Sequence, residues 1–197
     1  MKERSGTRFL APSRILLVVL VSAIGPALFP ARAVSILAAE ARQLPDLSPA
    51  TASTLLAAVR SPKAKAVLVN VWATWCQPCR EEFPDILRLR QAYEERGLRV
   101  VLVSGDFPSD RARAVNFLAE HGVDFPTYIK DGDDMAFIDG LNKAWSGALP
   151  ATFLYDTKGS LLEWWEGKAS YSLLEKKVLL ALGGGPPPAP QRIKEVP

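Results

Sequence analysis

Two cysteines, Cys76 and Cys79, stand where an apolar run of the sequence changes into a charged one, and they are the only cysteines of the chain. The residues before them, 67–72, are mostly β-branched, apolar or aromatic, which is typical of a buried strand. The charged residues from Arg80 onward favour a helix. We therefore expect a strand that leads into a helix, with both cysteines in the first helical turn.

A helix N-terminus favours the ionisation of a thiol placed there, because its free N–H groups and the positive end of its dipole stabilise an anion. The thiolate is the nucleophile in disulfide exchange. Pro78 lies between the cysteines, has a fixed φ and donates no hydrogen bond, which suits a first helical turn. The C-x-x-C spacing lets Cys79 attack a mixed disulfide formed by Cys76, so the pair is a candidate for redox chemistry.

Other uses of the cysteine pair fit the sequence less well. A structural zinc site takes about four ligands, whereas the chain offers two cysteines and one histidine, His121. Attachment of a c-type haem needs C-x-x-C-H, and here Arg80 follows Cys79. A purely structural disulfide stays open, although so short a loop would restrain little chain entropy.

The segment 72–80, WATWCQPCR, resembles the thioredoxin superfamily, and in particular its extracytoplasmic TlpA/ResA-type thiol–disulfide reductases. The resemblance covers roughly residues 66–182. It implies an α/β domain with a thioredoxin fold, in which helices flank a central mixed sheet, and with the helical insert of the TlpA/ResA type. It also implies that an exposed Cys76 attacks a substrate disulfide and that Cys79 resolves the mixed disulfide.

The same resemblance assigns residues to the substrate side of the site. Pro150 matches a cis proline that precedes a central strand and lies opposite the C-x-x-C motif, so the backbone of Leu149 would pair with a substrate chain as an added strand. The alternative is a proline that starts a strand at a turn. Trp72 and Trp75 would flank the cysteines as packing and substrate surface, and Gln77 is expected to face the substrate.

Pro78, the other residue between the cysteines, is also expected to contact the substrate.

The proton acceptor for Cys79 is harder to assign. Thioredoxins carry a buried Asp six residues before the first cysteine, where this chain has Asn70, which cannot take up a proton. TlpA/ResA-type members share this departure. An acidic residue just past the next strand helps to move the proton in the family, and Asp106 is the nearest match. A turn or N-cap role for Asp106 is an equal alternative.

The order of predicted elements indicates one α/β domain over residues 48–182, with a terminal hairpin that supplies an antiparallel strand. Arg80, Glu81 and Glu82 are expected on a solvated helix face. The predicted elements are a helix over 51–60 that begins at Ser48–Pro49, a strand over 67–72, a helix over 81–96, a strand over 98–103, a helix over 110–121, an extended segment over 123–129, a helix from 131–134 through 145, strands over 152–156 and 161–165, and a helix over 171–182.

The first 33 residues have the pattern of a secretory signal peptide. A basic segment, 1–14, precedes an apolar run, 15–29, and Ala31-Arg32-Ala33 provides small residues for cleavage. The run is short for a membrane-spanning helix and contains a proline, so cleavage is favoured over a membrane anchor, which stays open. The pattern points to the periplasm, where a cysteine pair can hold or exchange a disulfide. We expect a flexible leader over 34–47 and a flexible Gly/Pro-rich tail over 183–197.

The formal net charge of +3 does not indicate a nucleic-acid partner, because residues 1–33 contribute +4 and leave −1 for the remainder. We expect a monomer that contacts the membrane only through its N-terminal segment, if that segment is uncleaved. We also expect no metal and no cofactor other than the redox-active disulfide Cys76–Cys79.

The expected function is that of an exported thiol-disulfide oxidoreductase that reduces disulfides of exported proteins. By resemblance, its electrons would come from a membrane thiol carrier, and its substrates could include apocytochrome c. Two other classes stay open: an oxidase or isomerase that donates disulfides, and a non-catalytic adaptor that uses the Pro-rich tail and two tryptophans, Trp164 and Trp165, as contacts. These tryptophans are adjacent on one strand, so one of them should be partly exposed.

Overall fold

A computed structural model describes residues 44–60 and 63–185 of the chain. The predicted signal peptide over 1–33, residues 34–43 of the predicted leader and the tail from residue 186 onward lie outside this part. Among the described residues, no helix is both long and apolar enough to cross a membrane. The regular elements run from Leu47 to Ala181, close to the predicted domain of residues 48–182.

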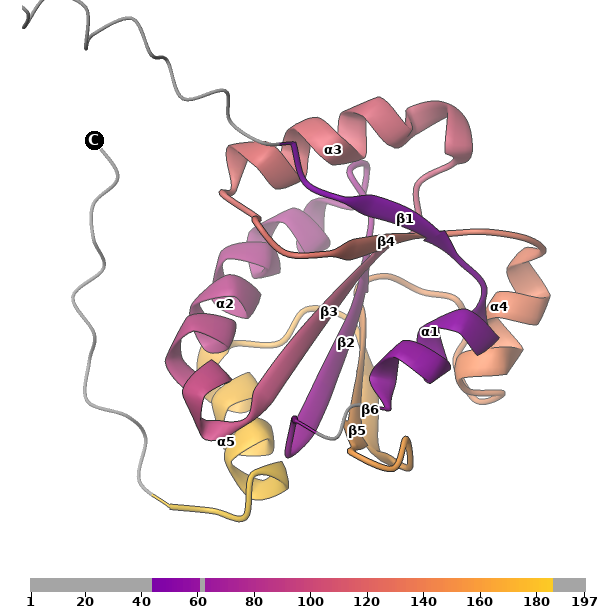
Figure 1. The fold of residues 1–197 in the computed structure, drawn as a ribbon. Coiled ribbons are helices and arrows are strands. Elements are labelled where there is room, and N and C mark those ends of the chain that lie inside the picture. Colours follow the sequence, from indigo (N-terminus) through magenta and orange to yellow (C-terminus); the bar gives the residue numbers. More distant parts are fainter. Residues whose placement is uncertain (1–43, 61–62, 186–197) are drawn as a thin grey trace, which may run out of the picture. The chain divides into compact units, whose positions relative to one another are not determined.

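One six-stranded sheet organises the described residues, with the strand order β1-β4-β3-β2-β5-β6 (Figure 1). The strands β1, β4, β3 and β2 run parallel to their neighbours, whereas β5 is antiparallel to β2 and β6 is antiparallel to β5. The predicted mixed sheet with a terminal hairpin is therefore confirmed. The strands are β1 (Leu47–Ala50), β2 (Ala66–Trp72), β3 (Leu98–Ser104), β4 (Thr127–Lys130), β5 (Ala151–Asp156) and β6 (Leu161–Glu166).

Helices cover both faces of this sheet, with α2, α3 and α5 on one face and α1 and α4 on the other (Figure 1). Between β3 and β5 the chain forms α3, β4 and α4, where the sequence predicted two helices joined by an extended segment. The helices are α1 (Ala52–Val59), α2 (Gln77–Tyr93), α3 (Arg111–Glu120), α4 (Asp134–Leu141) and α5 (Tyr171–Ala181), with short 3-10 turns at Glu94–Arg96 and Pro108–Asp110.

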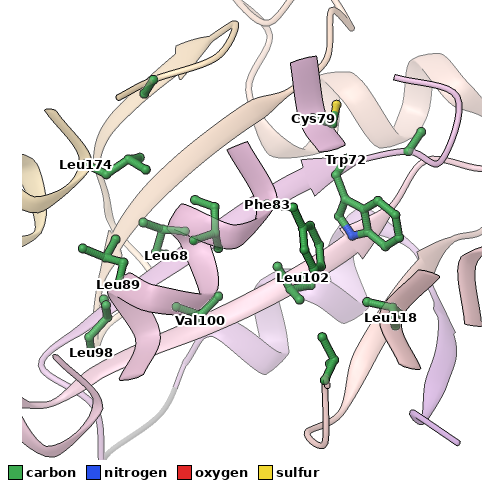
Figure 2. Close-up of a cluster of buried hydrophobic side chains, with 14 of the residues drawn as sticks. Leu68, Trp72, Cys79, Phe83, Leu89, Leu98, Val100, Leu102, Leu118 and Leu174 are labelled. Carbon is green, nitrogen blue, oxygen red and sulfur yellow. The ribbon is translucent and has the colours of Figure 1, made fainter. Parts of the chain in front are cut away.

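The central strand β2 is buried along its whole length because both of its faces are covered. Its side chains alternate between two hydrophobic clusters. Leu68 and Trp72 belong to the cluster under α2 and α5, which Figure 2 shows together with Phe83. Val67 and Val69 belong to the cluster under α1 and α4. Asn70 is two residues from both Leu68 and Trp72 along the strand, so its side chain lies on the same face, the α2 side of the sheet.

The N-terminal part of the domain differs from its prediction. Ser48 and Pro49 do not begin a helix; they lie in β1, which pairs in parallel with β4. Thr51 caps α1 instead, its side chain accepting a hydrogen bond from the Thr54 N–H at 3.3 Å. Leu47, predicted in the flexible leader, is 1% exposed. The reason is tertiary, because β1 is stabilised by a partner about 80 residues away in the chain.

One further helix boundary is also corrected. The helix predicted through Trp145 ends at Leu141, and Trp145 packs in the α1–α4 cluster with its indole N–H donated to the Ala148 carbonyl at 3.0 Å. Trp164 and Trp165 point to opposite faces of β6, as adjacent strand residues must. Each packs against one of the two clusters and both are half-buried, so the prediction that they do not both face one core and that one is partly exposed is confirmed.

Candidate active site

The two cysteines lie at the start of α2 and are joined by a disulfide bond. Cys76 is the N-cap residue of the helix, and its sulfur accepts a hydrogen bond from the Cys79 N–H at 3.3 Å. Pro78 occupies the first turn, as predicted. Cys76 is 5% exposed and Cys79 is 2% exposed. The expectation of an exposed Cys76 is therefore wrong for this oxidised form, although Cys76 is the more accessible of the two.

The two tryptophans of the motif have different environments. Trp72 is 1% exposed, and its ring centroid lies 5.0 Å from that of Phe83 and 4.9 Å from that of Phe117. Figure 2 shows Trp72 and Phe83 close to Cys79 at one end of the cluster. Trp75, in contrast, is 57% exposed. The two tryptophans were expected to serve as packing and substrate surface, and the structure divides these roles: Trp72 supports the site from within, so its predicted contact with a substrate is wrong, whereas Trp75 is accessible.

The residues between the cysteines, Gln77 and Pro78, are both exposed. The Gln77 amide donates a hydrogen bond to Glu81 one helical turn later, at 3.2 Å. Both residues are thus accessible to a partner molecule, and their contact with a substrate stays a prediction.

The Leu149–Pro150 peptide bond is cis, as predicted, and Pro150 immediately precedes β5. The side chain of Leu149 lies close to Gly105, whose N–H donates to the Trp72 carbonyl at 2.7 Å. Within the described part of the chain, the backbone N–H and C=O of Leu149 have no hydrogen-bond partner. Leu149 and Trp75 line one shared pocket of about 200 Å³. The fold thus brings the proline turn next to the cysteine motif.

Asp106 is fully buried, and four hydrogen bonds reach its carboxylate. The Thr74 N–H donates to both oxygens, at 3.1 and 3.0 Å, and the Thr74 hydroxyl donates at 2.6 Å. The Ser104 hydroxyl donates at 2.7 Å. Asp106 therefore anchors the loop that precedes Cys76 to the end of β3. Its participation in proton transfer stays a prediction.

Glu82 is an acidic residue of the site that the sequence reasoning missed. It was expected on a solvated helix face, yet it is 2% exposed. One carboxylate oxygen accepts a hydrogen bond from the Asn70 amide at 3.1 Å, and the other accepts one from the Ala169 N–H at 2.6 Å. Burial raises the pKa of Glu82 above its ordinary value, although both hydrogen bonds act in the opposite direction. The spacing of Cys79, Glu82, Phe83 and Ile86 on one helix face is the signal that could have revealed it.

Arg80 and Glu81 behave as predicted and are exposed. Glu81 pairs with Lys168 at 2.6 Å, which joins the start of α2 to the loop between β6 and α5. The same loop contacts the proline turn, because the Gly167 N–H donates to the Pro150 carbonyl at 2.8 Å. Residues 167–169 therefore connect the cysteine helix with the proline turn. Within residues 44–60 and 63–185, no three metal-ligating side chains lie close enough together to hold a metal ion.

The chain resembles one known protein family and several known proteins. The model of the AhpC/TSA family matches residues 41–163. The thiol-disulfide oxidoreductase ResA of Bacillus thuringiensis (strain Al Hakam) is 32% identical over 113 residues, which are 57% of this chain and 61% of that protein. The thioredoxin-like protein YneN of Bacillus subtilis is 30% identical over 141 residues, 71% of this chain and 78% of that protein.

Among solved structures, a thioredoxin-family thiol:disulfide interchange protein from Chlorobium tepidum matches with 26% identity and a TM-score of 0.52. The match covers 71% of this chain and 97% of that one. The predicted thioredoxin-type fold is confirmed by these neighbours. The chain spans about three fifths of the length of the ResA protein that it matches.

Proposed function

Because this chain belongs to the AhpC/TSA family of thioredoxin-like proteins, we propose that it is a thiol-disulfide oxidoreductase whose redox group is the Cys76–Cys79 pair. The observation that carries this proposal is the placement of the pair. The two sulfurs form a disulfide at the N-terminus of α2, next to an accessible surface made by Trp75 and Leu149. The curated relatives named as thiol-disulfide oxidoreductases support it.

The proposed reaction begins with the reduced pair. The thiolate of Cys76 attacks one sulfur of a substrate disulfide, and the other substrate sulfur leaves as a thiolate. The thiolate of Cys79 then attacks the Cys76 sulfur and releases the second substrate thiolate. The substrate gains two electrons and two protons, and the protein is left with the Cys76–Cys79 disulfide. The roles follow from position, because Cys76 lies at the helix tip and is the more accessible sulfur.

Glu82 is the proposed acceptor of the Cys79 proton. It follows Cys79 by three residues and lies on the same helix face, and helical side chains lean toward the preceding turn. Its carboxyl group is buried, and burial raises its pKa toward the working range of a base near neutral pH. Asn70, which takes the place of the thioredoxin Asp, is hydrogen-bonded to this carboxylate and so acts beside it.

The proposed substrates are disulfides of exported proteins, apocytochrome c among the candidates, with electrons supplied by a membrane thiol carrier. The export pattern of residues 1–33 supports this compartment, and the relatives named as thiol-disulfide oxidoreductases support exchange between protein thiols and disulfides. A substrate chain would pair with the backbone of Leu149, which has no partner within the described residues, and would contact the exposed ring of Trp75.

The test is the reduction potential of the purified chain, equilibrated against thiol buffers of known poise. A value near or below about −250 mV supports a disulfide reductase that needs an electron donor. A value near about −120 mV reverses the proposed direction and makes the protein a disulfide donor. A cysteine pair that never exchanges with the buffer refutes the redox function and leaves the adaptor class.

A further inference from the structure

The buried amide of Asn70, on β2, connects its own strand to the neighbouring strand β5 and to helix α2. Its nitrogen donates one hydrogen bond to the Glu82 carboxylate at 3.1 Å and another to the Thr152 hydroxyl at 3.0 Å. Asn70 and Glu82 are each 2% exposed and Thr152 is 1% exposed. Asn70 lies on β2 and Thr152 lies directly across from it on β5, whereas Glu82 comes from α2.

This arrangement leaves the Glu82 carboxylate little freedom. An amide nitrogen has two hydrogens, and both hydrogens of Asn70 are used. Rotating the amide would break both bonds. The second Glu82 oxygen is held by the Ala169 N–H at 2.6 Å. Thr152 follows the cis proline by two residues, and the Pro150 carbonyl accepts from Gly167 in the same loop as Ala169. Glu82 is thus tied to the proline turn in two ways: through Asn70 to Thr152, and through Ala169 to the loop that binds the Pro150 carbonyl.

We propose that Asn70 and Thr152 are positioning residues for the resolving step, in which Asn70 holds the Glu82 carboxylate over the helical turn of Cys79 and Thr152 holds the Asn70 amide in the orientation that does so. This inference rests on the proposed function and deepens it. On β2, Asn70 stands where thioredoxins have an acidic residue. Its amide holds the proposed base, Glu82 on α2, in a fixed position. Asn70 thus assists the proton transfer by orienting Glu82, and does not itself accept the proton.

The electrostatic surroundings give the direction of the effect. Burial raises the pKa of Glu82, and the charge of Asp85 on α2 acts in the same direction. The hydrogen bonds from the Ala169 N–H and Asn70, and the charge of Lys168 on the β6–α5 loop, lower it. Removing the Asn70 amide therefore raises the pKa of Glu82 further. Glu82 then stays protonated, and unable to accept the Cys79 proton, up to a higher pH.

The experiment follows the reduced full chain as it reacts with dithiodipyridine, an aromatic disulfide that releases a coloured thiopyridone. The first release reports attack by Cys76, and the second reports attack by Cys79 on the mixed disulfide. Both rates are measured across pH by stopped flow. In Asn70→Leu, which keeps the side-chain size but removes the amide, we expect the pH midpoint of the second phase to rise by about one unit, as for the loss of one hydrogen bond to a charged group.

Thr152→Val tests the same chain of contacts more gently and should shift the second midpoint in the same direction by less, while Thr152→Ser should restore it. The first-phase midpoint should stay unchanged in all three. Thr127→Val is the matched control, because Thr127 is also 1% exposed and donates to the distant Asp46 carbonyl. It should lose stability without moving either midpoint.

The outcomes separate the two proposals. A wild-type chain that shows no second phase refutes the proposed function itself. Suppose the wild-type chain shows both phases. If Thr152→Val then keeps the wild-type pH midpoint of the second phase, and Asn70→Leu does so where it folds, only the positioning role is refuted. A raised midpoint in these variants, absent from Thr127→Val, supports the role.

Discussion

The clearest structural test concerns Asp106, whose two candidate roles, anchor and proton carrier, predict opposite results. Asp106→Ala removes the acceptor for three donors: the Thr74 N–H, the Thr74 hydroxyl and the Ser104 hydroxyl. An unsatisfied buried donor costs about 1–3 kcal/mol. The two hydroxyls can rotate toward other acceptors, so we take the lower end and expect a loss of about 3 kcal/mol in the free energy of unfolding.

Asp106→Asn separates anchoring from proton transfer. The side-chain oxygen of the asparagine can still accept from the Thr74 hydroxyl, and its new N–H₂ group can donate to the Ser104 oxygen. We therefore expect this variant to keep most of the stability, with a loss of about 1 kcal/mol from the Thr74 N–H. Because an amide cannot carry the proton, a proton carrier would lose the second phase with dithiodipyridine, whereas an anchor would keep it.

The assay is urea unfolding of the oxidised protein, with the disulfide intact in every variant so that the unfolded states are comparable. The anchor role is refuted if Asp106→Ala unfolds at the same urea concentration as wild type. If Asp106→Asn is as stable as wild type but resolves mixed disulfides far more slowly, Asp106 carries the proton and anchoring is not its only role.

Further predictions address the other residues of the site and the core. Cys79→Ser should accumulate mixed disulfides with protein substrates, whereas Cys76→Ser should not; adducts trapped through Cys79 would reverse the assigned roles. Because burial raises the pKa of Glu82 above 4.5, the fold favours its neutral form, and that stabilisation is lost as pH rises through the folded-state pKa. Glu82→Gln should therefore gain stability relative to wild type between pH 4.5 and neutral pH, and a difference that does not vary with pH would contradict this sign. Trp75→Ala should slow the reduction of a protein disulfide but not of dithiodipyridine, with unfolding free energy within about 0.5 kcal/mol of wild type. Tyr155→Phe should be at least as stable as wild type, because the buried Tyr155 hydroxyl lacks a hydrogen-bond partner among the described residues and burial raises its pKa to about 12; a clear drop in thermal midpoint would indicate a partner.

The parts of the site that the sequence predicted are those specified locally. The strand before Cys76 and the helix after it follow from hydrophobicity and capping within a short window. Pro150 was identified through the resemblance to thioredoxin-like proteins, by its position just before the strand predicted over 152–156. The sheet's first strand was missed because Leu47 and its neighbours are stabilised by β4, a contact distant in sequence. No local pattern distinguishes such a segment from a loop.

Glu82 was missed for a different physical reason. Charged residues are rarely fully buried, so a Glu within the charged segment after Cys79 is expected in solvent. Its burial depends on partners from other elements, Asn70 on β2 and the Ala169 N–H before α5, which the tertiary fold alone brings together. The near-complete burial of Cys76 has a similar origin, since neighbouring segments cover a helix tip that would be accessible in isolation.

The alternation along β2 has a consequence for how such a protein can vary. Asn70 and Trp72 face the helix that carries the cysteines, whereas Val67 and Val69 face α1 on the other side of the sheet. Repacking the deep part of the α1 side should therefore change resistance to heat or denaturant without altering proton transfer at the sulfurs. A lineage adapting to a new temperature, or an engineer with the same aim, has a set of core positions that can be adjusted independently of catalysis.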